Sequence, residues 1–171
     1  MKKFYLFFVF TLILSSSLFA QRQGISLGGN VYLPVGDWAE YAAVGYGAST
    51  TYEHQLGRNM AGVISVAYIS FSGDEEGTSW TMIPALAGVK FYFSPKMDWY
   101  ITGLLGANFV TAETTVLEQE YSASSTEFAF SANLGYELKK KKKGALDISG
   151  GFQYISDLSY FGLRLAYKFI L

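Results

Sequence analysis

The amino-acid sequence predicts an all-β fold, namely an eight-stranded antiparallel up-and-down transmembrane β-barrel. Three observations support this prediction: eight segments alternate apolar with polar residues, the connections between them differ in length, and only 16 % of the residues are charged. Alternation at every second residue is typical of a half-buried strand, because successive side chains of a strand point to opposite faces. Since soluble domains carry about 25 % charged residues, the low charge also favours a large apolar surface.

The eight alternating segments are the predicted strands, and they cover residues 24–33, 44–54, 60–71, 80–93, 99–109, 127–138, 145–155 and 159–169. In the first, Ile25, Leu27 and Val31 share one face. The second, fourth and fifth follow the same period, whereas the two faces of the third are hard to distinguish. The fourth contains Pro84, which predicts a bulge or an irregular start because proline cannot donate a hydrogen bond to a sheet.

The last three strands carry the clearest pattern. Every second residue of the sixth strand, from Phe128 to Leu138, is apolar, and the seventh and eighth repeat the alternation. Apolar residues three and four positions apart, which an amphipathic helix requires, are not the rule here. The connections 55–59, 94–98 and 139–144 are short and lie at one end, whereas 34–43, 72–79 and 111–125, with the short 156–158, lie at the other. Such connections describe a meander that closes on itself.

The first 20 residues are typical of a secretory signal peptide. Lys2 and Lys3 precede a short apolar run, three serines follow, and Ala20 is the small residue expected before a cleavage site. An uncleaved N-terminal membrane anchor is the alternative. We therefore expect residues 1–20 to be a signal peptide and residues 21–171 to form the barrel domain. Gln21 rather than cysteine follows Ala20, so a lipidated N-terminus is not indicated.

The composition argues against several function classes. The absence of cysteine argues against a disulfide-stapled module, and a formal net charge of −1 argues against nucleic acid as a partner. His54 is the only histidine, and one histidine without cysteine does not suffice for a zinc site of the usual type. We expect no catalytic residues, no bound metal and no cofactor, and hence a protein that is not an enzyme.

The orientation of the two strand faces separates a membrane barrel from a soluble one. In a soluble exported barrel the apolar face lines a cavity that binds an apolar ligand, whereas in a membrane barrel that face contacts lipid. The polar face here is rich in glycine, serine and asparagine with charges of both signs, as a narrow interior requires. Aromatic residues gather near strand ends, as in interfacial girdles, and segments of about ten residues match a tilted membrane strand. These features favour the membrane barrel.

Several motifs resemble the outer-membrane β-barrel domain family of small eight-stranded OmpA/OmpX-type proteins. They are Gly28-Gly29 through Leu33-Pro34-Val35-Gly36-Asp37-Trp38, Gly45-Tyr46-Gly47, Ile83-Pro84-Ala85 leading to Gly88-Val89-Lys90-Phe91-Tyr92-Phe93, and the closing segment from Phe161 to Phe169. The resemblance implies a bacterial outer membrane location and contact with outer-membrane lipid. It also implies insertion by the barrel-assembly machinery, which reads a C-terminal aromatic residue; here Ile170 and Leu171 follow Phe169.

Charged residues on the polar face predict an ion-pair network inside the barrel. Its expected members are three cations and three acids: Arg164, Lys90, Lys168, Glu127, Glu137 and Asp147. An isolated arginine there would carry a large desolvation cost, so Arg164 should pair with one of the acids. The network is expected to be a static polar plug. The alternative is a gated pore whose pairs exchange partners.

The two ends of the predicted barrel differ in charge. With the termini in the periplasm, the outer connections contain nine acids and no lysine or arginine: Asp37, Glu40, Asp74, Glu75, Glu76, Glu113, Glu118, Glu120 and Asp157. The periplasmic turns contain Arg58, Lys96 and the basic run Lys139, Lys140, Lys141, Lys142 and Lys143 against one acid, Asp98. Such charges commonly serve only to keep turns in water. The sharper hypothesis is that the acidic loops attract divalent cations, or a cationic or other extracellular partner. The lysine run could likewise meet anionic headgroups of the inner leaflet.

Together these features predict a non-enzymatic outer-membrane protein with a structural or surface-interaction, adhesin-like role. A porin-like protein, that is, a small ion or solute channel with a charged, gated lumen, is one alternative. A soluble exported barrel that binds an apolar ligand is another.

Overall fold

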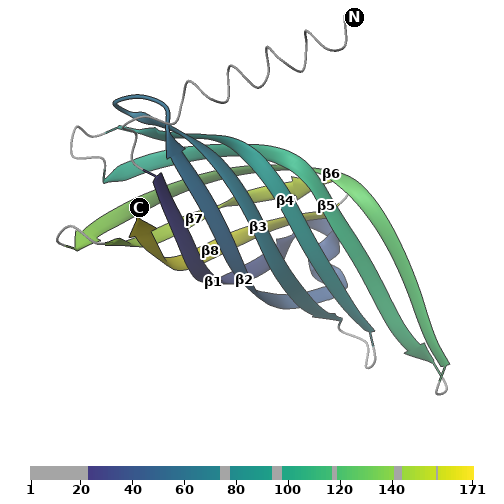
Figure 1. Ribbon diagram of the computed structural model, residues 1–171. Helices are drawn as coiled ribbons and strands as arrows, with labels where there is room; N and C mark the ends of the chain where they lie inside the picture. Colours follow the sequence, from purple (N-terminus) through teal and green to yellow (C-terminus); the bar gives the residue numbers. More distant parts are fainter. Residues whose placement is uncertain (1–22, 74–77, 94–97, 117–118, 141–143, 157) are drawn as a thin grey trace, which may run out of the picture.

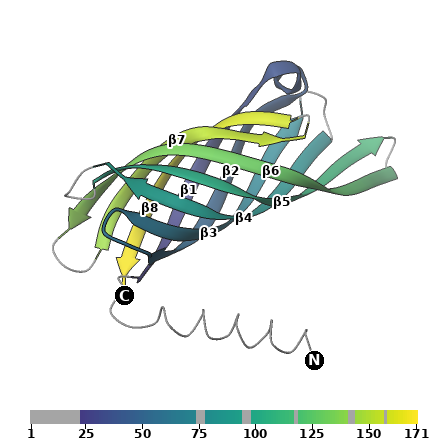
Figure 2. The same cartoon turned by 90° about the horizontal axis from the view of Figure 1, so that it is seen from above.

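Eight antiparallel strands close into a barrel in the computed structural model, which describes residues 23–73, 78–93, 98–116, 119–140, 144–156 and 158–171 (Figures 1 and 2). The strands are β1 Gln23–Val35, β2 Ala42–Gln55, β3 Met60–Gly73, β4 Thr78–Tyr92, β5 Trp99–Val116, β6 Gln119–Lys140, β7 Gly144–Ile155 and β8 Leu158–Ile170, with a 3-10 helix η1 at Gly36–Glu40. Each strand pairs with the next, and β8 pairs with β1. The predicted fold class is confirmed.

The described residues contain no helix long and apolar enough to cross a membrane. The expected signal peptide, residues 1–20, lies outside the described residues. The barrel itself begins and ends at one rim, where the amide of Leu171 donates a hydrogen bond to the carbonyl of Gln23 at 2.9 Å. We call this the terminal rim, and the opposite one, where β1 leads into η1, the outer rim.

The apolar face of each strand points outward. Large apolar side chains such as Leu27, Ile64, Leu105, Leu134 and Leu165 are each more than half exposed, at 52–57 %. On β6 the outward apolar residues run from Phe128 to Leu138. At the tilt of about 40° usual in such barrels, these ten steps rise about 25 Å, the height of a lipid-facing band. An outward surface of this kind contradicts the soluble barrel, in which the apolar face would line the cavity.

Aromatic side chains mark both ends of the outward band. Near the terminal rim, Trp99 packs against Tyr136 with ring centroids 4.9 Å apart, and Tyr167 packs against Phe169 at the same distance. Near the outer rim Phe152 packs against Phe161 at 5.3 Å. Amphipathic and aromatic rings prefer the boundary between lipid and water, so the two groups set the expected membrane boundaries.

Pro84 lies within β4 without a change of register. On either side of Pro84, Ala85 of β4 pairs with Val66 of β3 and Met82 of β4 pairs with Ile69 of β3. These two pairs have the same register. Between them the ladder to β3 is interrupted, because proline has no backbone N–H to donate. On the other side Pro84 pairs with Asn108 of β5. The predicted bulge or irregular start is therefore wrong: the ladder is interrupted but its register is kept.

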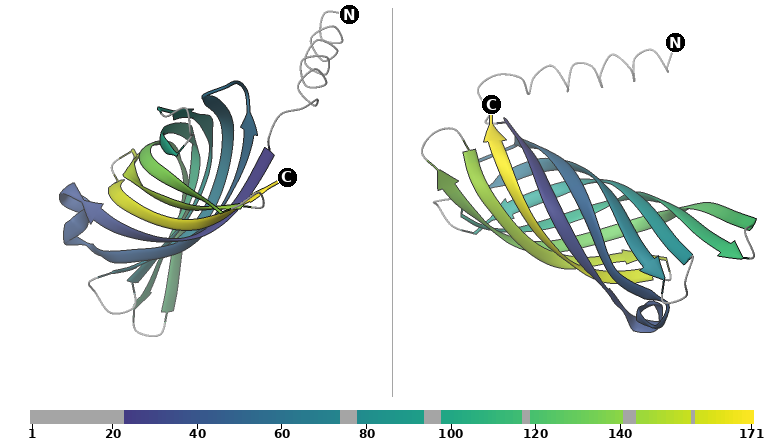
Figure 3. Two further views of the ribbon diagram at one scale, coloured as in Figure 1. Left: turned by 90° about the vertical axis from the view of Figure 1, so that its left-hand side faces the viewer. Right: turned by 90° about the horizontal axis from the view of Figure 1, so that it is seen from below.

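The segment 111–125, which the sequence predicts as a long loop, mostly forms strand. β5 and β6 stay paired out to Val116 and Gln119, whereas β7 joins β6 only from Ala129, opposite Ile155. The resulting ribbon, which we call the β5–β6 hairpin, extends well beyond the rest of the outer rim (Figure 3). The alternation of apolar residues does not predict these strand residues, because the hairpin covers neither lipid nor core and contains serine, threonine and glutamate instead.

Candidate functional site: the barrel interior

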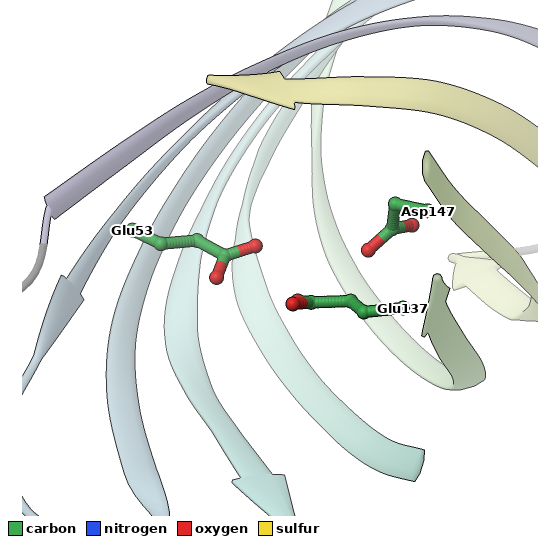
Figure 4. Close-up of side chains that lie close together, drawn as sticks. All are labelled: Glu53, Glu137 and Asp147. Carbon is green, nitrogen blue, oxygen red and sulfur yellow. The ribbon is translucent and has the colours of Figure 1, made fainter. Parts of the chain in front are cut away.

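Three carboxylates converge inside the barrel near the terminal rim. Glu53 of β2, Glu137 of β6 and Asp147 of β7 point toward one another (Figure 4), with one oxygen of each within 4.8 Å of the others. All three are at least 94 % buried, with exposed fractions of 6 %, 3 % and 1 %. Three ionised carboxylates this close would repel strongly unless cations lie between them.

Two lysine ammonium groups lie among these carboxylates. Lys90 Nζ donates to Glu53 Oε1 at 2.9 Å, to Glu137 Oε1 at 2.5 Å and to Asp147 Oδ2 at 3.4 Å. Lys168 Nζ donates to Glu53 Oε2 at 2.5 Å and to Glu137 Oε1 at 3.0 Å. Because these ammonium groups already fill the space between the acids, the three carboxylates do not form an open metal site.

Two tyrosines complete the hydrogen bonds of the acids. Tyr92 donates to Glu137 Oε1 at 2.9 Å, and Tyr100 donates to both oxygens of Asp147 at 2.8 Å. The Tyr100 ring also lies under Lys90, with Nζ 3.6 Å from the ring centroid. Gly135 makes room for this ring, since a Cβ there would lie 2.2 Å from Tyr100 Cζ.

Arg164 extends the network toward the middle of the barrel. Its Nη1 donates to Asp147 Oδ1 at 3.2 Å, and its Nε donates to Ser49 Oγ at 3.0 Å. Its Nη2 donates to Ser26 Oγ at 2.6 Å and to Thr51 Oγ1 at 3.4 Å. We call the six charged residues and the two tyrosines the charge layer: Glu53, Glu137, Asp147, Lys90, Lys168, Arg164, Tyr92 and Tyr100. Its formal charges, three positive and three negative, cancel.

Glu127 does not belong to the charge layer. Its carboxylate accepts a hydrogen bond from Ser156 Oγ at 2.7 Å, in the connection between β7 and β8 at the outer rim. Glu127 and Glu137 share one face of β6, but they are ten positions apart along the strand, a separation of about 33 Å. This placement corrects the grouping of Glu127 with the network. The third acid of the network is instead Glu53, which contacts the predicted members Lys90 and Lys168.

An aromatic layer fills the interior at the outer rim. Trp38 of η1 is 5 % exposed, and its ring centroid lies 4.6 Å from that of Phe71 and 6.1 Å from that of Tyr160. Tyr32 packs edge-on against Tyr160 at 5.1 Å. We call Trp38, Phe71, Tyr160 and Tyr32 the aromatic layer. Val35 and Gly36, the latter with a φ of +70°, lead the chain into η1 and thus place Trp38 over the barrel mouth.

A cavity of about 100 Å³ remains between the two layers. Its lining includes polar side chains such as Asn30, Asn133, Gln153 and Arg164. The amide nitrogens of Asn30 and Gln153 are buried there without a hydrogen-bond partner in the protein. A polar space of this size has room for several water molecules.

The predicted loop residues are only partly described. Glu113 lies in β5 and is exposed, and Asp37 and Glu40 are exposed in η1. The positions or side chains of the other predicted loop residues lie outside the described part: Asp74, Glu75, Glu76, Glu118, Glu120 and Asp157 at the outer rim, and Lys139, Lys140, Lys141, Lys142 and Lys143 at the terminal rim. His54, near the end of β2, is at the terminal rim and far from these acids.

Two features of the interior are not among the predicted site residues. The tyrosines of the charge layer could have been found, because Tyr92 and Tyr100 fall on the same strand faces as Lys90 and Thr102. Trp38 could not, because it lies in a connection where no strand period indicates its direction.

Comparison with known proteins rests on structure alone. No protein-family model matches the chain, and no curated protein matches its sequence. The crystal structure of Ail, the attachment invasion locus protein of Yersinia pestis, is 20 % identical over 88 % of this chain and 99 % of that chain, with a TM-score of 0.68. Another structure holds Ail in complex with the heparin analogue sucrose octasulfate.

Two other solved structures are similar over nearly the same length. Neisserial surface protein A is 9 % identical over 86 % of this chain and 96 % of that chain, with a TM-score of 0.64. The N-terminal β-barrel domain of OprF from Pseudomonas aeruginosa is 13 % identical over 88 % of this chain and 100 % of that chain, with a TM-score of 0.50. At these identities the similarity establishes the fold. The chain has the fold of the small eight-stranded outer-membrane β-barrels of OmpA/OmpX type.

Proposed function

We propose that this chain is an outer-membrane protein that acts through its outer surface as a structural or surface-interaction protein, without enzymatic activity. Support for the location comes from the outward apolar band with its aromatic boundaries. A surface of this kind is unfavourable in water and favourable in lipid. The terminal rim faces the periplasm in this proposal, and the outer rim with the β5–β6 hairpin faces the outside.

The observation that carries the proposal is a barrel interior closed by packing at two levels. Ions crossing it would have to displace the aromatic layer and then separate the charge layer, whose acids and cations are held by several hydrogen bonds each. With the interior blocked, the outer surface is the part of the molecule left to meet a partner. This favours a surface role over the small channel.

The charge of the outer connections argues against a ligand like the one bound to Ail. Sucrose octasulfate is a polyanion, and the outer connections of this chain carry nine acids without lysine or arginine. Like charges would oppose such a ligand. The acidic rim supports a cationic partner instead.

Planar-bilayer recordings test the closed interior. We expect no ion current from the wild-type protein, because both layers are intact. We also expect none from Arg164→Ala, because the lysines and the aromatic layer still fill the interior. Steady single-channel currents from the wild-type protein would contradict the proposal and favour the channel. Current from Arg164→Ala alone would show that this arginine keeps a pore closed.

A further inference from the structure

The wall of the cavity between the two layers contains two hydrogen-bond donors without an acceptor. They are the side-chain amide nitrogens of Asn30 on β1 and Gln153 on β7. The two residues are only 5 % and 8 % exposed, both line the cavity, and neither nitrogen has a hydrogen-bond partner in the protein. Leaving a buried donor without an acceptor is unfavourable. The cavity therefore favours contents that accept hydrogen bonds.

A relay of two hydrogen bonds fixes the orientation of the Asn30 amide. Arg164 Nε donates to Ser49 Oγ at 3.0 Å, and Ser49 Oγ donates to Asn30 Oδ1 at 3.2 Å. Because a hydroxyl has a single proton, the amide oxygen of Asn30 must face Ser49 to accept it. The Asn30 nitrogen, and not its oxygen, is thus left for the cavity. The relay also places this amide only one hydroxyl away from the guanidinium of Arg164.

The least buried charge in the cavity wall is positive. The Arg164 side chain is 18 % exposed, against 7 % for Glu53 and 3 % for Lys90, which also line the cavity. The carboxylate of Glu53 accepts hydrogen bonds from Lys90 and from Lys168, so cations already compensate its charge. Arg164 therefore sets the sign of the charge that the cavity presents to its contents.

The rest of the polar lining adapts to a small acceptor. It includes hydroxyl groups that can turn to donate or to accept: Thr51, Ser65, Thr102, Ser131 and Ser149. The volume of about 100 Å³ limits the size of the contents. Since a water-sized sphere needs about 10–15 Å³ of such a volume, a halide ion fits with several water molecules beside it.

We propose that the cavity binds one small monovalent anion of the halide class, held by Asn30 Nδ2 beside the guanidinium of Arg164. An anion accepts hydrogen bonds without protons of its own to place, and a charged acceptor makes the stronger hydrogen bond. Gln153 Nε2 donates to a water molecule next to the ion. The site goes beyond the proposed function, because it lies in the closed interior and stabilises the barrel from within.

Anomalous scattering from bromide locates the ion directly. The probe is sodium bromide, present while the protein refolds in detergent and while it crystallises. We expect one anomalous peak in the cavity, within hydrogen-bond distance of Asn30 Nδ2 and next to Arg164. Density in the cavity without an anomalous signal would mean water only and would overturn the proposal.

The dependence of stability on chloride measures the binding. The protein is refolded into lipid vesicles and titrated with urea in sodium chloride or in sodium gluconate, at equal ionic strength. One ion that binds only the folded state lowers the unfolding constant by up to about tenfold for each tenfold rise in its concentration. We expect a fall of about three- to tenfold with chloride and none with gluconate, which is too large for the cavity. Equal curves in the two salts would contradict the site.

Matched variants assign the chloride effect to Asn30. Asn30→Asp keeps an acceptor for Ser49 but places a negative charge where the anion binds, so the chloride dependence should disappear. Asn30→Leu removes the donor without adding a charge and should abolish it as well, which guards against misfolding of the first variant. Asn59→Asp makes the same change as the first in the connection between β2 and β3 and should keep the dependence within about twofold, since a distant surface charge acts weakly.

A chloride dependence that persists in both Asn30 variants would place the ion elsewhere and would overturn the assignment. Loss of the dependence in Asn59→Asp as well would show a general effect of charge on the barrel, with the same consequence.

Discussion

Replacing Lys90 with methionine is expected to lower the free energy of unfolding by about 3–5 kcal/mol, the usual effect of removing one partner from a buried ion pair. Lys90 is 2 % exposed and, among the residues that the structure describes, is the one group that contacts Glu53, Glu137 and Asp147 together. Without it the charge layer keeps three acids but only two cations. Urea titration of the barrel refolded into lipid vesicles, followed by tryptophan fluorescence, measures the change.

A second variant separates charge from packing at Lys90. Lys90→Met combined with Glu53→Gln removes one cation and one acid, so the layer is again balanced. We expect it to recover at least half of the lost stability, because an uncompensated buried charge is the larger cost. Glu113→Gln, on the exposed hairpin, serves as the neutral control. A stability of Lys90→Met within about 0.5 kcal/mol of wild type would mean that the charge layer does not hold the barrel together.

Replacing Trp38 with alanine is expected to lower the free energy of unfolding by a similar amount, about 3–5 kcal/mol, as for other buried tryptophans. The change removes the ring that packs on Phe71 and Tyr160 and leaves the aromatic layer open to water. The same urea titration measures it. The variant should remain without ion current, because the charge layer beneath is intact.

The neighbouring aromatic residue provides the control for Trp38. Tyr41 is 62 % exposed, so Tyr41→Ala should change stability by no more than about 0.5 kcal/mol. Trp38→Phe keeps an aromatic ring in the layer and should retain most of the wild-type stability. Equal effects of Trp38→Ala and Tyr41→Ala would show that η1 does not contribute to closing the outer rim.

The barrel could be predicted from the sequence because lipid imposes a strict rule on it. Every second residue in the band must be apolar, so strand number, strand face and the inward direction of Lys90, Arg164 and Asp147 all follow from one period. The hairpin could not be predicted in the same way. Outside the lipid no such rule applies, and Thr111 to Ser125 therefore has the composition of a loop although most of it forms strand.

The sequence predicts which strand face an interior residue lies on better than it predicts the position of that residue along the barrel axis. Alternation shows that Glu127 and Glu137 share a face of β6, but a network also requires equal height in the barrel, and the separation of ten positions along the strand excludes it. The strand register that aligns Glu53 with Lys90 and Lys168 depends on all eight strands together. The tilt of the strands in the closed barrel sets this register, and the sequence of no single strand determines that tilt.

Protease treatment of intact cells tests the central claim, a lipid-embedded barrel whose acidic rim is outside and whose basic turns are inside. The claim predicts that a glutamate-specific protease cuts the chain in the β5–β6 hairpin, which contains Glu113, Glu118 and Glu120. Trypsin should leave the chain whole, because the outer connections contain no lysine or arginine, and should cut at Lys139 to Lys143 only after the outer membrane is permeabilised. Trypsin cleavage in intact cells, or resistance to the glutamate-specific protease, would contradict it.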